Sequence, residues 1–160
     1  MSRNRNTAQL SRCRRYRYAL WRTWDRALPR VLFIGLNPST ADESIDDPTL
    51  VRCMRFARDW GYGGVSIGNL FAYRATQPAD LKQASHPIGV RNDDWLARLA
   101  AEAALTVAAW GNDGAWMNRA TAVRASLTDL HCLKLNDTGE PAHPLYQRRD
   151  RVPLPLPRTP

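Results

Sequence analysis

The sequence has few cysteines, and they show no metal-binding spacing. Its 160 residues contain three cysteines, Cys13, Cys53 and Cys132, which are scattered along the chain. An odd number of scattered cysteines suggests neither a disulfide framework nor a CxxC metal site. We therefore expect a reducing, cytoplasmic location, with no metal or redox cofactor.

Long hydrophobic runs and internal repeats are also absent. No apolar stretch approaches the ~20 residues of a membrane span, and the N-terminus lacks the apolar region of a secretory signal. A hydrophobic content of 44% with six tryptophans is too high for a disordered chain. The sequence predicts one globular domain of ordinary size with no membrane partner.

Lysine is rare, although the chain is strongly basic. The formal net charge is +8 and the sequence pI is about 10.1, yet Lys82 and Lys134 are the only lysines. Arginine pairs bidentately with phosphate and stacks on bases. This balance favours a nucleic-acid partner, whose phosphates supply most of the affinity. The alternative is a basic surface without a specific partner, with the arginine bias of a GC-rich genome.

Composition divides the chain into three regions. Residues 1–15 carry five arginines among polar neighbours and predict a mobile basic arm. Residues 16–146 form the single expected domain. Residues 147–160 are rich in arginine and proline, so we expect an irregular tail that contacts phosphates.

Short apolar runs alternate with helical patterns in the expected domain, which predicts an α/β fold. The expected strands are 31–34, 65–70, 105–110 and 130–135, with a half-exposed N-terminal edge strand at 16–24. The expected helices are 47–60, 78–84, 95–104 and 116–127. This alternation predicts a three-layer α/β/α fold with a central, mainly parallel four-stranded sheet.

Polar side chains follow each of the four expected parallel strands. They are Asn37, Asn69, Asn112 and His143. The carboxyl ends of parallel strands meet at one sheet edge, where ligands of open α/β sheets bind. We therefore expect these side chains to converge on one site. The alternative is that they only cap helices and turns.

The stretch R-V-L-F-I-G-L-N-P-S-T-A-D is the most informative part of the chain. Gly35 lets the backbone turn and a ligand come close, and the proline after Asn37 stiffens the loop that carries the amide. Ser39 and Asp42 add a hydroxyl and a carboxylate. Asp47 precedes a proline and fits a helix cap better than a catalytic role.

The segment F-A-Y-R-A-T begins two residues after Asn69. It brings Phe71, Tyr73 and Arg74 to the same sheet edge, and two rings with a guanidinium can stack on and recognise a base. The alternative is that Phe71 belongs to the core and that Asn69 caps a turn.

On these motifs the sequence resembles the uracil-DNA glycosylase superfamily. The segment Gly35-Leu36-Asn37-Pro38 is similar to the first glycosylase motif, and His143-Pro144 is similar to the last. More closely, residues 32–146 resemble a bacterial and phage family catalogued as a domain of unknown function and assigned to this fold. The motifs that carry this closer resemblance are N-P-S-T-A-D, D-D-P-T, N-L-F-A-Y-R-A-T, A-W-G and H-P-L-Y.

The resemblance implies a monofunctional DNA glycosylase that hydrolyses the N-glycosidic bond of a flipped-out base. It implies that Asn37 holds the attacking water, that Asp42 polarises this water or stabilises the oxocarbenium ion, and that His143 stabilises the departing base. The implied base-binding residues are Gly35, Ser39, Asn69, Phe71 and Tyr73, and the implied DNA-backbone contacts are Arg74, Arg148 and Arg149. The implied partner is DNA, bound by a monomer without a cofactor.

The sequence departs from the uracil enzymes in three respects. Leu145-Tyr146 replaces Ser-Pro in the last motif, and the cysteines of the iron–sulfur members are absent. The aromatic wall of the uracil pocket has only Phe71, Tyr73 or Trp60 as candidates. A larger base is therefore expected, such as a glucosylated hydroxymethylcytosine of phage DNA removed in antiviral defence. Two other functions stay open: a non-catalytic binder of nucleic acid or a modified base, and a nucleoside or nucleotide hydrolase.

Overall fold

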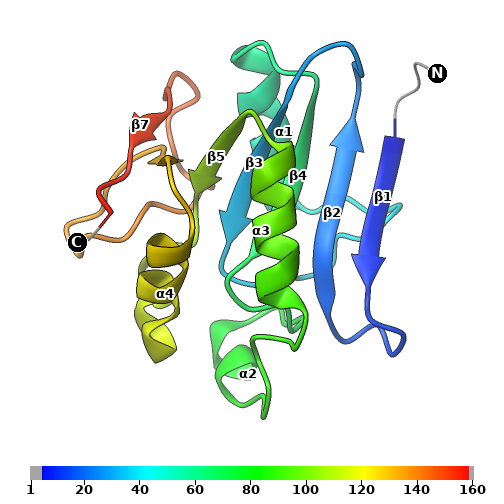
Figure 1. The fold of residues 1–160 in the computed structure, drawn as a ribbon, viewed down its shortest axis with the longest axis vertical. Helices are drawn as coiled ribbons and strands as arrows, with labels where there is room; N and C mark the ends of the chain where they lie inside the picture. Colours follow the sequence, from blue (N-terminus) through cyan, green and yellow to red (C-terminus); the bar gives the residue numbers. More distant parts are fainter. Residues whose placement is uncertain (1–4, 159–160) are drawn as a thin grey trace.

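The computed structural model describes residues 5–158 and has a mixed α/β fold (Figure 1). Its strands are β1 (Arg5–Leu10), β2 (Arg17–Thr23), β3 (Arg30–Gly35), β4 (Gly64–Asn69), β5 (Leu105–Ala108), β6 (Leu130–Cys132) and β7 (Leu154–Pro155). Its helices are α1 (Pro48–Asp59), α2 (Pro78–Lys82), α3 (Asn92–Glu102) and α4 (Arg119–Ser126), with a 3₁₀ segment η1 (Asn112–Asn118) before α4. Within the described part of the chain, no helix is both long and apolar enough to cross a membrane.

The strands form one seven-stranded sheet in the order β1-β2-β4-β3-β5-β6-β7. Strands β4, β3, β5 and β6 pair in parallel with their neighbours, whereas the pairs β1–β2, β2–β4 and β6–β7 are antiparallel. The expected sheet had four mainly parallel strands and one edge strand. The observed sheet has seven strands, and the strands on both sides of it pair antiparallel, so the expectation is wrong in strand number and in the direction of these outer strands.

Helices cover both faces of this sheet, because alternate residues of the buried strands point to opposite sides. Phe33 of β3 packs with Phe56 of α1 in one core cluster. Ile34, the next residue of β3, packs with Leu96 of α3 and Val123 of α4 in the other cluster. In Figure 1, α3 and α4 lie in front of the sheet and α1 lies behind it.

The expected N-terminal arm contains a strand. Residues 5–10 form β1 and pair with β2 along its length, so β2 is an inner strand and not the edge of the sheet. The segment R-N-T-A-Q-L lacks the apolar alternation that indicates a strand, and backbone pairing with β2 determines its conformation instead. Residues 1–4 of the expected arm lie outside the described residues.

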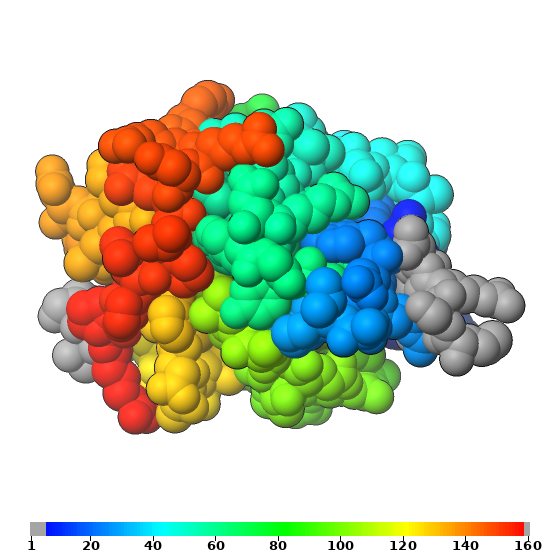
Figure 2. All heavy atoms as spheres, turned by 90° about the horizontal axis from the view of Figure 1, so that it is seen from above, coloured from blue at the N-terminus to red at the C-terminus, as the bar shows by residue number. Residues whose placement is uncertain are grey.

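The C-terminal segment is packed on the domain, and within its described residues only Leu154–Pro155 form a strand. Its strand β7 pairs with β6, Leu156 is buried in the core, and the indole Nε1 of Trp60 donates to the Arg151 carbonyl at 3.0 Å. Figure 2 shows this segment, in orange and red, running beside the end of α1. Residues 159 and 160 of the expected tail lie outside the described residues.

Two helix starts illustrate local sequence control. The predicted start of α1 is confirmed, since the Asp47 carboxylate accepts from the Leu50 amide at 2.8 Å and a proline occupies the first turn. The helix expected from residue 116 begins instead at Arg119. Met117 and Asn118 have positive φ angles of 57° and 54°, which interrupt the helix.

Arg22 fastens the loop between β3 and α1 to the sheet. Its side chain is fully buried, and its Nε donates to Asp46 Oδ1 at 2.8 Å. Its other nitrogens donate to three backbone carbonyls, of Trp21 at 3.0 Å, Asp42 at 2.5 Å and Ile45 at 3.1 Å. This guanidinium therefore helps to determine the path of the loop that leads into α1.

We expect Arg22→Ala to lower the free energy of unfolding by about 2–4 kcal/mol, because it removes four hydrogen bonds of a buried side chain and creates a cavity. Asp46→Asn removes only the ion pair, and Asp46 is half-exposed. Its expected cost is below about 1 kcal/mol. Urea denaturation of both variants measures this order, and equal losses would contradict it.

Candidate functional site

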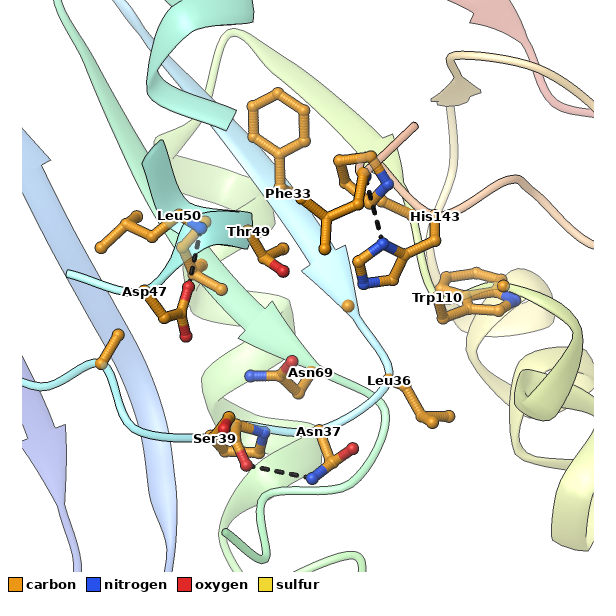
Figure 3. A pocket seen from close by; sticks show the side chains of 18 of the residues that line it. Phe33, Leu36, Asn37, Ser39, Asp47, Thr49, Leu50, Asn69, Trp110 and His143 are labelled. Carbon is orange, nitrogen blue, oxygen red and sulfur yellow. Dashed lines mark hydrogen bonds between the residues drawn. The ribbon is translucent and has the colours of Figure 1, made fainter. Parts of the chain in front are cut away.

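A cavity of about 520 Å³ lies at the carboxyl ends of β3, β4 and β5 (Figure 3). Its volume is in the range of small-molecule sites. All four polar side chains predicted from the strand ends line it, namely Asn37, Asn69, Asn112 and His143. Gly35 and Ser39 also line it. The sheet thus brings together residues from four widely separated parts of the chain.

The amide of Asn37 has a fixed orientation. Its Nδ2 donates to the carbonyls of Ala75 at 2.8 Å and Pro38 at 3.0 Å. Because a carbonyl group can only accept hydrogen bonds, the amide nitrogen of Asn37 faces both partners and its oxygen points away from them. Asn37 Oδ1 is therefore an acceptor for a ligand or a water molecule.

Asn69 is a buried amide that is not fully bonded. It is 3% exposed, and its Nδ2 has no hydrogen-bond partner among residues 5–158. A Cβ atom on Gly35 would come within 2.9 Å of Asn69 Oδ1, so only glycine at position 35 leaves room for this amide. A buried donor without an acceptor is costly, and an acceptor on a ligand would satisfy it.

His143 lies at the cavity mouth, partly open to solvent. Its Nδ1 accepts from the Leu145 amide at 3.2 Å, so the proton of the neutral ring is on Nε2. Burial by the surrounding atoms lowers the pKa of His143, and the nearby charge of Asp47 opposes this shift without cancelling it. Neutral His143 is therefore an N–H donor at neutral pH.

Two carboxylates line this cavity, Asp47 and Asp113. Asp113 pairs with Lys82 Nζ at 3.1 Å, whereas Asp47 has no ion pair of 4.0 Å or less within residues 5–158. One oxygen of Asp47 caps α1, and Figure 3 shows its carboxylate directed toward the side chains of Asn69 and Ser39. From the sequence, capping was the favoured role of Asp47 over catalysis. Its position at the start of a helix that follows the Asn37 loop is the signal that places it beside the strand ends.

Asp42 lies outside this cavity. Its Oδ1 accepts from the backbone amides of Ser44 at 2.9 Å and Ile45 at 2.8 Å, and these bonds lower the pKa of Asp42. It lines a neighbouring, more open cavity together with Tyr73 and Arg74. The structure therefore gives Asp42 a turn-forming position and does not bring it to Asn37 and His143.

The aromatic side chains of the cavity are not those expected. Phe71 is fully buried in the core, with its ring centroid 4.9 Å from that of Trp116. Trp60 stacks on Phe33 at 6.0 Å and does not line the cavity. The rings that do line it are Phe33 and Trp110. Phe33 belongs to β3 and Trp110 follows β5. Both stand in motifs described above, Phe33 in the stretch 30–42 and Trp110 in A-W-G, but no role in the site was expected for either ring.

The two expected backbone contacts in the C-terminal segment lie on the surface and pair with carboxylates. Arg149 contacts Asp59 at 3.1 Å, and Arg148 contacts Asp150 at 2.7 Å. Arg74 lies beside the cavity, where its Nε donates to the Ser39 carbonyl at 3.3 Å. Of the three arginines, only Arg74 is adjacent to the site.

Cys53 also lines the cavity, but burial raises the pKa of its thiol far above neutrality. It stays protonated, which makes it a poor nucleophile. Between residues 5 and 158, no three histidine, cysteine, aspartate or glutamate side chains cluster so as to hold a metal ion. The groups that remain for chemistry are amides, a neutral imidazole, two carboxylates and hydroxyls.

Comparison with known proteins identifies the family. A family described as "Protein of unknown function (DUF1643)" matches residues 17–145, so the chain belongs to this family. This match extends from β2 to the end of the His143 loop and includes all the cavity residues named above. Neither the comparison with curated proteins nor the comparison with solved structures found a match.

The lowered pKa of His143 predicts a pH-dependent stability. The unfolded chain binds a proton to this ring near pH 6.5, whereas the folded chain binds it only at lower pH. The contribution of His143 to the free energy of unfolding is therefore fully present above pH 6.5. It falls as the pH drops from 6.5 toward the pKa of His143 in the folded chain. We expect His143→Gln to reduce the difference in melting temperature between pH 8 and pH 5.5.

The matched control is His86→Gln, because His86 is exposed and lies outside the cavity. It should leave the pH dependence of the melting temperature unchanged. An equal change in both variants would refute the assignment of this pH dependence to His143.

Proposed function

We propose that this protein is a DNA glycosylase of the uracil-DNA glycosylase type, which hydrolyses the N-glycosidic bond of a flipped-out base. The observation that carries the proposal is the meeting of Asn37, Asp47, Asn69 and His143 in one cavity. These groups match the needs of the reaction, as the following steps describe.

Glycosidic hydrolysis builds positive charge on the sugar and negative charge on the departing base. A water held by Asn37 Oδ1 would attack the anomeric carbon while the bond to the base breaks. Asp47 would accept the proton of this water and stabilise the oxocarbenium character of the sugar. The electron pair of the broken bond leaves with the base.

His143 would stabilise that electron pair by donation from Nε2. A donor aimed at the developing anion contributes more inside a water-poor cavity than in bulk solvent. Asn69 Nδ2 would donate to a carbonyl oxygen of the base, which supplies the acceptor that the buried amide lacks. Phe33 and Trp110 would contact the apolar part of the ligand.

A large modified base remains the preferred substrate. The cavity of about 520 Å³ exceeds the smallest ligand sites, and the net charge of +8 favours DNA over a free nucleoside. Glucosylated hydroxymethylcytosine of phage DNA is a substrate of this kind, and its removal would serve antiviral defence.

The test is base release measured by mass spectrometry. Single- and double-stranded DNA would carry uracil, mismatched thymine, hydroxymethylcytosine or its glucosylated form. We expect one free base and an alkali-labile abasic site from the corresponding substrate. DNA binding without release from any substrate would support a non-catalytic binder.

A pair of variants then tests the carboxylate. We expect Asp47→Asn to slow base release by about 10²–10⁴-fold, the usual loss of a general base. Its fold should persist because asparagine is an equally good helix cap. Asp42→Asn is the matched control, since the asparagine oxygen still accepts from the same amides, and we expect its rate to stay within about threefold of wild type. The opposite order would make Asp42 the catalytic group.

A further inference from the structure

Among the residues whose burial the structure describes, four arginines are buried inside the domain, and one of them differs from the others. Their exposed fractions are 4% for Arg17, 1% for Arg22, 5% for Arg119 and 1% for Arg124. Three have a carboxylate within 4.0 Å, on Asp46, Asp93 and Glu140 respectively. Arg17 makes no such ion pair with any residue from 5 to 158.

Arg17 is also short of hydrogen bonds. Its Nη1 donates to the Ala41 carbonyl at 2.9 Å, and its buried Nε has no partner in the described part of the chain. Arg22 lies on the same strand, is also buried, and donates four hydrogen bonds. A buried charge normally has paired groups around it, because an unpaired one costs several kcal/mol.

The location of Arg17 suggests what it pairs with. Arg17 lines the same cavity as Asn69, whose Nδ2 is also buried without a partner. Burial lowers the pKa of Arg17 to about 10, so the side chain is still charged at neutral pH. Asp47 and Asp42 offset this charge in part, while Arg74 and Arg22 add to the positive potential.

We propose that Arg17 is the anchor of an oxyanion subsite in this cavity. Its ligand carries either a phosphate, as in a nucleotide, or a carboxylate on the base. Both groups present planar or forked oxygens that a guanidinium binds with charge-assisted hydrogen bonds. This subsite concerns binding alone, so it stands whether or not the cavity cleaves a glycosidic bond.

The test is calorimetric titration of the whole protein with matched ligands. The four common 2′-deoxynucleosides are compared with their 5′-monophosphates, deoxycytidine with 5-carboxydeoxycytidine, and inorganic phosphate is the competitor. We expect at least tenfold tighter binding for one oxyanion series. A preference for the monophosphates, with competition by phosphate, identifies a phosphate site. A preference for the carboxylated base identifies a carboxylate site. If neither oxyanion binds tighter than its neutral partner, the proposal is wrong.

Variants separate this role from a structural one. Arg17→Met should abolish the oxyanion preference without lowering the melting temperature, because it removes an unpaired buried charge. Arg55→Gln removes the same charge from an exposed position on α1 and should keep the preference.

A second pair covers the case in which Arg17→Met does not fold. Arg17→Lys keeps the charge but lacks the fork, and should weaken the preference at least fivefold. Arg119→Lys changes a buried arginine that does not line the cavity, and it should lower the melting temperature and leave the preference intact. An unchanged preference in the folded Arg17 variants would overturn the proposal.

Discussion

The loop between β3 and α1 is held by two buried guanidiniums, those of Arg17 and Arg22, and the site depends on where this loop runs. In the second half of this loop, Arg22 donates to the carbonyls of Asp42 and Ile45 and pairs with Asp46. Asp47 follows directly and caps α1. The first half of the loop carries Asn37, fixed by the carbonyl of Ala75. The acceptor amide and the Asp47 carboxylate therefore belong to one segment fastened at these points.

The convergence of the polar strand ends was accessible from the sequence. Buried β-branched runs followed by Asn37, Asn69 and Asn112 indicate parallel strands that end at one edge, and the structure places all three side chains on one cavity. The start of α1 was equally accessible, because an aspartate before a proline is a local signal. Such features depend only on neighbours in the chain and on the rules of parallel pairing.

Other features depend on contacts that no local pattern encodes. β1 has a polar sequence and owes its conformation to β2, and β7 is held by pairing with β6. Asp42 and Asp47 are five residues apart, and the sequence favours Asp42 for catalysis and Asp47 for capping. The turn at residues 42–45 engages one in its own backbone, while the start of α1 turns the other toward the cavity. Phe71 likewise enters the core because it faces Trp116, a residue 45 positions later.

The electrostatics of the cavity limit the ligands it can hold. Its lining includes a buried cation at Arg17, a carboxylate at Asp47 and a ring at His143 whose pKa is lowered by burial. A carboxylate of the ligand next to Asp47 would make it costly to ionise both groups. An oxyanion of the ligand at Arg17 instead balances a positive charge that has no ion-pair partner in the described part of the chain. A neutral ring with its proton on Nε2 adds a donor without adding charge. The cavity therefore favours a ligand with an anionic group at one end and a hydrogen-bond acceptor at the other, as a nucleotide has.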